Sequence, residues 1–416
     1  MCRCRTGERR FASVDRRGRA GCANSRRLEV VDVKWSLQVI GIGLVLGLLS
    51  PVVLAAENRV VLPIETTAKQ AVMLDVTTNT ILLDKKAEER MPTSSMSKMM
   101  TIYLVFEALQ QGKLKLEDEV PVSAAAWRME GSRMFANVGS KVKVEDLIRG
   151  VIIQSGNDAS VALAEAVAGN EEIFARRMNE KSKLLGLTNS HFMNATGLPD
   201  PQHYSTPLDL ARLGIALHRD FPQYYYYFGE KEFVFNKIKQ GNRNPLLYRN
   251  IGADGIKTGH TEAAGFGLTA AVERAGRRIV LVVNGLNDMQ ERADEPARLI
   301  EHGYHEFGNY ALFKAGQEIA QAKVWLGTAP KIALVAAQDV KLTLPVTSRD
   351  KMKVSVEYEE PLLAPIHKGQ LAGKLVIIVP PLAPINIPLQ AATDVPKLGF
   401  FSALIEKLRM MFGGAA

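Results

Sequence analysis

Residues 92–101 read Pro-Thr-Ser-Ser-Met-Ser-Lys-Met-Met-Thr and open a long apolar segment. The apolar positions that follow recur with helical spacing, so a helix is predicted over residues 97–111. Ser95 and Lys98 are three residues apart, and side chains at that spacing share one face of a helix. Ser94 has no lysine three residues later. Ser95 is therefore predicted to be the nucleophile of a serine–lysine pair.

Two further short motifs follow along the chain, Ser155-Gly156-Asn157 and Lys257-Thr258-Gly259. Each motif alone has a simpler explanation, because Ser95 could cap a helix, Lys98 could be solvated and Asn157 could fill a turn. All three motifs in this order form a pattern that is typical of a covalent serine site. The sequence therefore predicts nucleophilic catalysis.

The residue types fit that chemistry. A serine hydroxyl is a weak nucleophile and needs a base within hydrogen-bond reach. Lys98 becomes a base if burial and a second cation lower its pKa, and Lys257 is predicted to be that cation. The backbone N–H of Ser95, at a helix N-terminus, is available to stabilise an oxyanion. Ser155 is predicted to relay a proton to the leaving group.

The other motif positions are predicted to hold the substrate. Asn157 is expected to contact both Lys98 and a substrate amide. Gly259 lacks a side chain, so an extended peptide is expected to lie along its strand as an added β-strand.

The order of predicted elements indicates an α/β fold, an antiparallel sheet covered by helices. Strands are predicted at residues 71–74, 81–83, 266–272 and 278–284, and helices at residues 97–111, 144–153, 159–168, 171–185, 208–218 and 291–307. Short alternating runs then predict a small all-β domain over residues 313–396, with strands at 332–336, 340–344, 352–358, 371–379 and 385–389. We expect the preceding domain to span residues 57–312.

Positive charge is concentrated at the start of the chain. Residues 1–56 hold ten Lys or Arg against four acidic residues, which leaves a net charge of only +2 for the rest of the chain. No basic patch remains that would indicate nucleic-acid binding. An apolar run at residues 39–49, followed by small residues, predicts a signal peptide cleaved near Ala56. Residues 1–56 are therefore assigned to an N-terminal extension and signal peptide and excluded from the predicted fold.

All three cysteines, Cys2, Cys4 and Cys22, lie in that segment. Their removal leaves no cysteine, which excludes thiol catalysis and disulfides and suits an oxidising compartment. No cofactor is expected.

The last segment, residues 397–416, contains an amphipathic helix. From Lys397 to Phe412, apolar residues gather on one helical face and charged residues occupy the rest. Sixteen residues reach about 24 Å, too short for a membrane span. We expect this helix to lie in the interface of a membrane surface; docking on the β domain is the alternative.

Beyond these patterns, the chain resembles a known family. Pro92–Thr101, Leu147–Ala159 and Asp254–Thr261 resemble the low-molecular-mass penicillin-binding proteins, and among them the D-alanyl-D-alanine carboxypeptidases of the penicillin-binding protein five type, peptidase family S11. The resemblance runs from about Glu65 to Phe412. It implies a β-lactamase/transpeptidase-like domain, a β domain and a terminal amphipathic helix.

The resemblance also implies an activity. A serine carboxypeptidase of this family removes the terminal D-alanine from a peptidoglycan pentapeptide through an acyl-enzyme, without a metal, and is acylated by β-lactam antibiotics such as penicillins. It implies a periplasmic enzyme attached to the inner membrane. Lys257, Thr258 and Gly259 would bind substrate, and His260 would supply a second oxyanion N–H. Arg292 would bind the terminal carboxylate, with Arg243 nearby; surface ion pairs are the alternative for both arginines.

Three other activities remain open. A β-lactamase shares the motifs, but no loop carries a convincing deacylating glutamate. A DD-endopeptidase shares the core without needing the β domain or terminal helix. A non-catalytic β-lactam sensor would carry several transmembrane helices, which the sequence does not predict.

Overall fold

A computed structural model describes residues 25–30, 58–380 and 382–412 of the chain. These residues form two compact units. The larger unit comprises residues 58–310 together with Lys341–Asp350, and the smaller comprises residues 25–30, Ala311–Val340 and the described residues from Lys351 onward.

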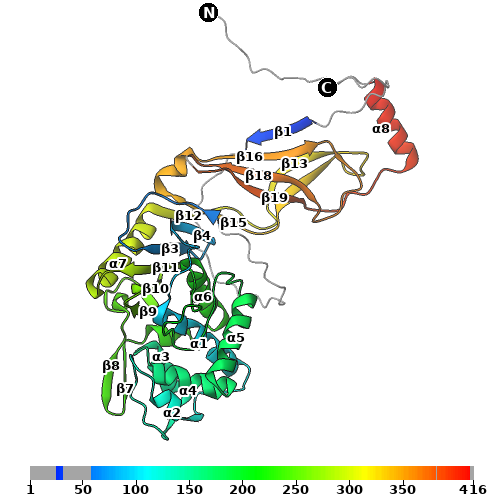
Figure 1. Cartoon of the computed structure of the whole chain (residues 1–416). Coiled ribbons are helices and arrows are strands. Elements are labelled where there is room, and N and C mark those ends of the chain that lie inside the picture. Colours follow the sequence, from blue (N-terminus) through cyan, green and yellow to red (C-terminus); the bar gives the residue numbers. More distant parts are fainter. Residues whose placement is uncertain (1–24, 31–57, 381, 413–416) are drawn as a thin grey trace, which may run out of the picture. The chain divides into compact units, whose positions relative to one another are not determined.

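A six-stranded sheet lies at the centre of the larger unit (Figure 1). Its strand order is β2-β4-β3-β11-β10-β9, with β2 at Asn58–Arg59, β4 at Thr80–Lys85, β3 at Gln70–Asp75, β11 at Arg277–Leu286, β10 at Gly265–Arg274 and β9 at Ala253–Thr261. β3, β4, β9, β10 and β11 pair antiparallel. Residues 279–283 of β11 are all buried because helices cover both faces of the sheet. The antiparallel sheet predicted from the sequence is thus present, with β9 as an additional edge strand.

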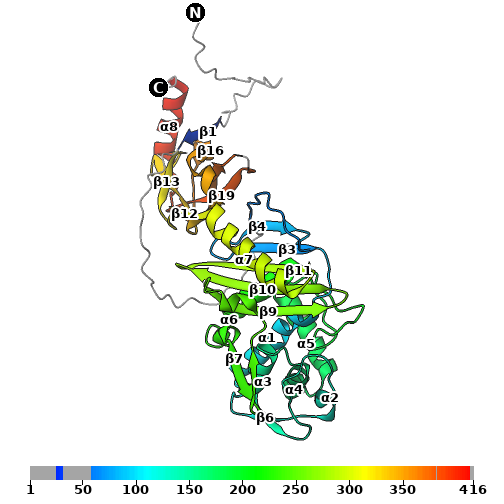
Figure 2. The same ribbon diagram turned by 90° about the vertical axis from the view of Figure 1, so that its left-hand side faces the viewer.

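Helices cover both faces of this sheet. α7 (Met289–Glu306) packs on β10 and β11 from one face, and α6 (Pro207–Asp220) packs on β3 and β11 from the other. Figure 2 shows the remaining helices grouped together: α1 at Lys98–Gln110, α2 at Ala124–Trp127, α3 at Val144–Ile152, α4 at Asn157–Ala168 and α5 at Glu171–Leu184. The helices predicted from the sequence agree with these bounds within a few residues.

α1 is the central helix of this group. Every residue from Lys98 to Phe106 is buried, since α1 contacts α3, α4, α5 and α6 around its circumference. A helix that is apolar all round belongs in a core. Lys98, at its first turn, is consequently removed from solvent as well, with an exposed fraction of 0%.

Two small hairpins and three 3₁₀ segments complete this unit, and none of them was predicted. The hairpins pair β5 (Glu119–Pro121) with β6 (Lys141–Lys143) and β7 (Glu232–Phe235) with β8 (Ile238–Gly241). The 3₁₀ segments are η1 (Ser94–Ser97), η2 (Tyr225–Gly229) and η3 (Pro245–Tyr248).

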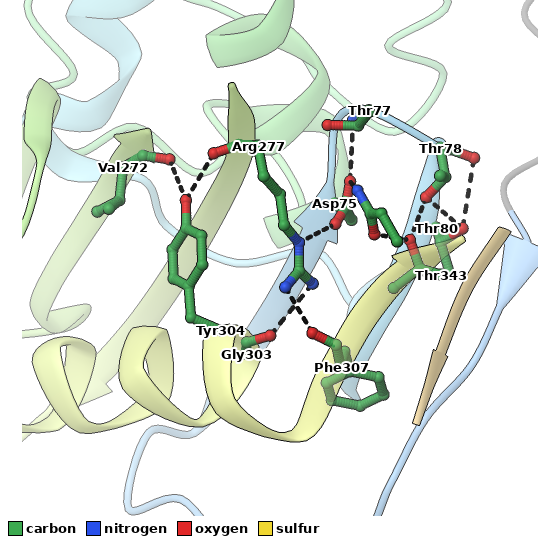
Figure 3. Close-up of polar contacts among 11 residues, drawn as sticks. Asp75, Thr77, Thr78, Thr80, Val272, Arg277, Gly303, Tyr304, Phe307 and Thr343 are labelled. Carbon is green, nitrogen blue, oxygen red and sulfur yellow. Dashed lines mark hydrogen bonds and ion pairs between the residues drawn. The ribbon is translucent and has the colours of Figure 1, made fainter. Parts of the chain in front are cut away.

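A buried polar cluster joins the end of β3 to α7 (Figure 3). Asp75 is fully buried and accepts a hydrogen bond from Arg277 Nε at 2.6 Å. The same guanidinium donates to the carbonyls of Gly303 and Phe307, at the C-terminal end of α7. Tyr304 O–H donates to Val272 O at 2.9 Å or Arg277 O at 2.8 Å. These bonds fix α7 against the sheet.

The cluster extends to a strand that is distant in the sequence. Thr343 lies on β15 (Val340–Pro345), donates to Asn309 Oδ1 at 2.8 Å and hydrogen-bonds Thr78. β15 pairs with β12 (Phe307–Phe313) rather than joining the sheet of the smaller unit. The sequence placed this strand in the β domain, whereas residues 341–350, including most of η4 (Val346–Lys351), pack with the larger unit.

The smaller unit is a seven-stranded sheet of order β1-β16-β18-β19-β14-β13-β17. Its strands are β1 at Ser25–Val30, β16 at Lys353–Glu360, β18 at Leu371–Ile378, β19 at Ile385–Ala391, β14 at Lys331–Ala336, β13 at Glu318–Trp325 and β17 at Leu362–Leu363. Residues 1–56 were excluded from the predicted fold, but β1 pairs antiparallel with β16 along its whole length. The predicted signal-peptide run and cleavage position lie outside the described residues.

α8 (Phe400–Phe412) ends the described chain, as predicted. Its apolar residues are exposed: Phe400, Phe401, Leu404, Ile405 and Leu408. Within the described ranges, no helix combines the length and apolar character that a membrane crossing requires.

Candidate active site

Ser95 and Lys98 lie at the junction of η1 and α1. Lys98 Nζ is 2.9 Å from Ser95 Oγ, 2.7 Å from Asn157 Oδ1 and 2.6 Å from the Thr196 carbonyl oxygen. A lysine ammonium has three N–H donors and can satisfy all three oxygens. A neutral amine has two, so its lone pair can face Ser95 while its two N–H groups hold Asn157 and Thr196. The predicted base is therefore in place to accept the serine proton.

The surroundings of Lys98 favour its neutral form. Burial, and secondarily the positive charge of Arg243, lowers the pKa of Lys98 to about 7, against the opposing effect of the Asp158 carboxylate. Lys257 was predicted to be the cation that lowers this pKa; Lys98 and Lys257 repel each other's positive charge, and Arg243 adds to the effect on both amines. Burial lowers the pKa of Lys257 itself far below its ordinary value, with further contributions from the charges of Lys98, Arg243 and Arg292.

The second motif occupies the turn between α3 and α4. Ser155 has a positive φ of 64°, which turns the chain sharply before Asn157 begins α4. Its Oγ is buried and, among the described residues, has no hydrogen-bond partner. Asn157 holds Lys98 through Oδ1, while its Nδ2 donates to Glu130 O at 2.6 Å. Ser155 therefore presents an unsatisfied hydroxyl to the site.

The third motif lies on β9, which is the edge strand of the sheet. Edge strands leave backbone N–H and C=O groups for an added strand, so an extended peptide can pair there. Besides the predicted reason for a glycine at position 259, which stays a prediction, the structure gives a second one. A Cβ on Gly259 would lie 2.9 Å from Thr93 O, so glycine is required for β9 to approach the segment that leads to Ser95.

A cavity of about 400 Å³ opens beside Ser95, on the side of β9 and α7. Its lining includes ten residues: Ser95, Ser132, Ser155, Arg243, Thr258, Gly259, His260, Phe266, Met289 and Arg292. The ring of Phe266 lies 3.9 Å from the ring of His260 and 5.3 Å from the Arg292 guanidinium. Most of the predicted site residues are thus brought together here, with Lys257 buried beneath them.

Two arginines, Arg243 and Arg292, line this cavity. Burial, and secondarily the charge of Arg243, lowers the pKa of Arg292, and partial desolvation lowers the pKa of Arg243, although Arg243 is exposed. Arg243 donates to Ser132 Oγ at 2.6 Å, and Arg292 Nε has no partner among the described residues. In the part of the chain that the structure describes, neither arginine has a carboxylate within ion-pair distance. A substrate carboxylate would supply the missing charge.

A second cavity of about 320 Å³ adjoins the first and shares Ser95, Ser132, Arg243 and His260 with it. Asn157 and four residues on the opposite wall, Thr196, Gly197, Leu198 and Thr261, also line it. Ser95 therefore lines both cavities. Among the described residues, no three His, Cys, Asp or Glu side chains group as metal ligands.

Several site residues carried no sequence signal. Thr196 acts through its backbone carbonyl, which any residue could provide. Gly197 has a positive φ of 77°, and a Cβ there would collide with the carbonyl of Ser94. Ser132 positions Arg243 from a loop without regular structure. Only an isolated glycine before an apparent turn could have marked position 197.

Comparison with known proteins agrees with this geometry. Residues 56–288 match the family described as D-alanyl-D-alanine carboxypeptidase, Peptidase S11, and residues 307–397 match the penicillin-binding protein 5 C-terminal domain. The chain is 37% identical to the D-alanyl-D-alanine carboxypeptidase DacA of Haemophilus influenzae over 360 residues, 85% of this chain and 92% of the relative.

Solved structures show the same likeness. Penicillin-binding protein 5 from Haemophilus influenzae matches with a TM-score of 0.73 and 37% identity, covering 81% of this chain and 99% of the other. Penicillin-binding protein D2 from Listeria monocytogenes in the ampicillin-bound form matches with a TM-score of 0.54 and 28% identity, covering 58% of this chain and 99% of the other.

The contact between Gly197 and Ser94 yields a prediction. In Gly197→Ala, the added methyl must displace the Ser94 carbonyl and hence Ser95, so labelling of Ser95 by a fluorophosphonate probe should slow by about 100-fold. Gly112→Ala is the matched control, because Gly112 also has a positive φ of 68° but an added Cβ would meet no atom within 4 Å. Equal labelling rates in the two variants would show that the contact does not position the nucleophile.

Proposed function

Since the chain belongs to the D-alanyl-D-alanine carboxypeptidases of peptidase family S11, we propose that it removes the terminal D-alanine from peptidoglycan pentapeptides with Ser95 as the nucleophile. The observation that carries this proposal is the contact of Lys98 Nζ with Ser95 Oγ at 2.9 Å in a buried site. β-Lactams would acylate the same hydroxyl, as the ampicillin-bound structural relative suggests.

The first step is acylation. Neutral Lys98 takes the proton of Ser95 as Oγ attacks the carbonyl carbon of the penultimate residue. The negative oxygen that forms is held by the backbone N–H groups of Ser95 and His260. The peptide C–N bond then breaks, and Lys98 returns the proton through Ser155 to the departing amine of D-alanine. The unpartnered, buried Ser155 Oγ supports this relay.

The second step is deacylation. Lys98 takes a proton from a water molecule, whose oxygen attacks the ester carbonyl of the acyl-enzyme. The ester C–O bond breaks, the proton passes from Lys98 to Ser95 Oγ, and the shortened peptide leaves with a new carboxylate. Asn157 keeps Lys98 aligned in both steps through its 2.7 Å contact.

The terminal carboxylate of the substrate is assigned to the 400 Å³ cavity. Arg292 is buried and Arg243 lies exposed at the rim of the cavity; neither has a carboxylate partner among the described residues, and Thr258 lines the same cavity. A carboxypeptidase must recognise a free chain end, and a carboxylate between two guanidinium groups provides that selectivity. Lys257, beneath the strand, adds positive charge to the same region when protonated.

Membrane attachment through residues 397–412 is a further part of the proposal. The exposed apolar face of α8 supports it, because such a face suits a helix that lies in the membrane interface. Export by a signal peptide ending near Ala56, and a periplasmic location, complete this assignment. The domain limits at residues 57–312, 313–396 and 397–416 likewise stay predictions.

The activity is tested with a pentapeptide that ends in D-Ala-D-Ala. The protein should release D-alanine and form a stoichiometric penicillin adduct by intact mass, and Ser95→Ala should lose both. An adduct without D-alanine release would indicate an endopeptidase or a sensor. Rapid penicillin hydrolysis without D-alanine release would indicate a β-lactamase.

The pKa of Lys98 predicts the pH dependence. Only the neutral amine can accept the serine proton, so kcat/KM should fall about tenfold per pH unit below pH 7 as Lys98 becomes protonated. In Arg243→Gln, loss of a nearby positive charge should raise that pKa and move the acid limb to higher pH. A profile that is flat between pH 5 and pH 7 would contradict the role of Lys98 as base.

Membrane attachment is tested by vesicle binding. Leu408 lies in the apolar face of α8, so Leu408→Glu should reduce co-sedimentation with vesicles by at least tenfold, because a charge enters the buried face. Ser402→Glu adds the same charge on the polar side of the helix and should bind within about twofold of the unmodified protein. Equal binding by both variants and the unmodified protein would argue against this anchor.

A further inference from the structure

Ser97 lies in the chain between the nucleophile and the base and has no part in the steps above. It precedes the first residue of α1, where a serine side chain ordinarily accepts a hydrogen bond from the helix backbone. Among the described residues, Ser97 makes no such capping bond. Its fully buried hydroxyl instead lies 2.7 Å from Nε2 of His203, a residue 106 positions later in the chain. A serine and a histidine at this distance have the spacing of a nucleophile and its base.

The second ring nitrogen of His203 decides the direction of this bond. The backbone N–H of Met193 donates to His203 Nδ1 at 3.2 Å, so Nδ1 carries a lone pair. A neutral imidazole then has its proton on Nε2, which donates to Ser97 Oγ. The proton of Ser97 is left for its other partner, Thr93 Oγ1. His203 is therefore a donor to Ser97 and not its base.

The surroundings of His203 favour the neutral ring. Burial lowers the pKa of His203 to about 4; the Asp200 carboxylate opposes this shift, and the charges of His191 and Lys98 add to it. Protonation of the ring would set an Nδ1–H against the N–H of Met193, two donors facing each other. Both bonds of the ring thus persist at neutral pH.

One of these bonds supports the loop that contacts the base. Residues 191–204 form a loop whose ends are joined by two backbone hydrogen bonds. Thr196 lies in this loop, and its carbonyl oxygen accepts from Lys98 Nζ at 2.6 Å. The ring of His203 reaches across the loop to Met193, three residues before Thr196. The carbonyl that holds the base is therefore connected to Nδ1.

The other bond acts on the turn that carries the nucleophile. Thr93 is the residue before η1, and Ser97 is the last residue of η1. The bond between their hydroxyls closes this turn around Ser95. The donor at Nε2 fixes the Ser97 hydroxyl in the orientation that this bond requires. A single imidazole thus contacts the segments that position both the nucleophile and the base.

We propose that His203 is a positioning residue, which joins the turn around Ser95 to the loop of residues 191–204 and so maintains the distance between nucleophile and base. The inference adds a residue to the proposed function and rests on the roles proposed there for Ser95 and Lys98. His203 lines neither of the two cavities that contain Ser95, so it acts through Ser97 and not on the substrate.

Two substitutions separate the two ring nitrogens. In His203→Gln the side-chain amide reaches the place of Nε2 and still donates to Ser97. In His203→Asn the shorter side chain reaches only the place of Nδ1 and still accepts from Met193. His203→Asn should reduce both kcat for D-alanine release and the rate of Ser95 labelling by a fluorophosphonate probe by about 30-fold, because the turn loses its donor. His203→Gln should keep both rates within about fivefold of the unmodified protein.

The Michaelis constant gives a second readout. Both substitutions leave the arginines of the 400 Å³ cavity unchanged, so KM for the pentapeptide should stay within about twofold of its original value. A loss confined to kcat is expected for a residue that aligns reacting atoms.

A double-mutant comparison assigns the loss to one contact. Ser97→Ala removes the same bond from the other side and should also slow both rates by about 30-fold. The combined variant should be no slower than either single variant, because both changes remove one interaction. His191→Asn is the matched control, since His191 belongs to the same loop but bonds the Gln202 carbonyl and lies against the ring of Tyr204. It should leave both rates unchanged.

The outcomes separate the inference from the function on which it rests. Equal rates in His203→Asn and His203→Gln, or a combined variant that shows the product of the two single losses, overturns the positioning role while Ser95 remains the nucleophile. Absence of D-alanine release from the unmodified protein overturns the proposed function, and the labelling rates still decide the role of His203. If His203→Asn does not fold, Ser97→Ala decides alone, and labelling at the original rate in that variant overturns the inference.

Discussion

The site depends on the burial of one amine in the first turn of an apolar helix. Lys98 begins α1, whose sides contact four other helices, so its Nζ has no access to bulk water and is surrounded by oxygen acceptors. Burying an ammonium ion in such a place costs free energy, and burying the neutral amine costs less, so the pKa of Lys98 falls. Packing of the core therefore sets the protonation state on which the chemistry depends.

The rest of the larger unit brings three separate segments to that amine. The α3–α4 turn carries Asn157, and the loop before α6 carries the carbonyl of Thr196; both contact Lys98. Strand β9 packs against the segment before Ser95, because Gly259 allows a close approach. Each segment belongs to a different layer of the fold. The sheet and its helices thus act as the support that holds these atoms within hydrogen-bond distance.

The sequence predicted those parts of the fold whose pattern is local. The amphipathic or buried helices and strands β3, β4, β10 and β11 follow from apolar periodicity, and Ser95, Lys98 and Asn157 follow from short motifs. What it missed depends on contacts between distant residues. The Thr196 contact uses a backbone carbonyl, which no side chain reveals. Arg243 lowers the pKa of Lys98 through space, from a distant part of the chain. Strand β15 has the same alternating pattern as the strands of the β domain, although it pairs with β12.

Strand β15 has a consequence for how the protein can be divided. The larger unit is made of two separate stretches of chain, because residues 341–350 belong to it although residues 311–340 before them belong to the smaller unit. A gene fragment ending near residue 312 would encode Ser95 and Lys98 but omit Thr343, and would leave Asn309 and Thr78 without the hydroxyl that joins them. The two units therefore cannot be exchanged between relatives as two contiguous segments of sequence. Recombination between relatives should preserve function best when its crossover points fall outside residues 307–350.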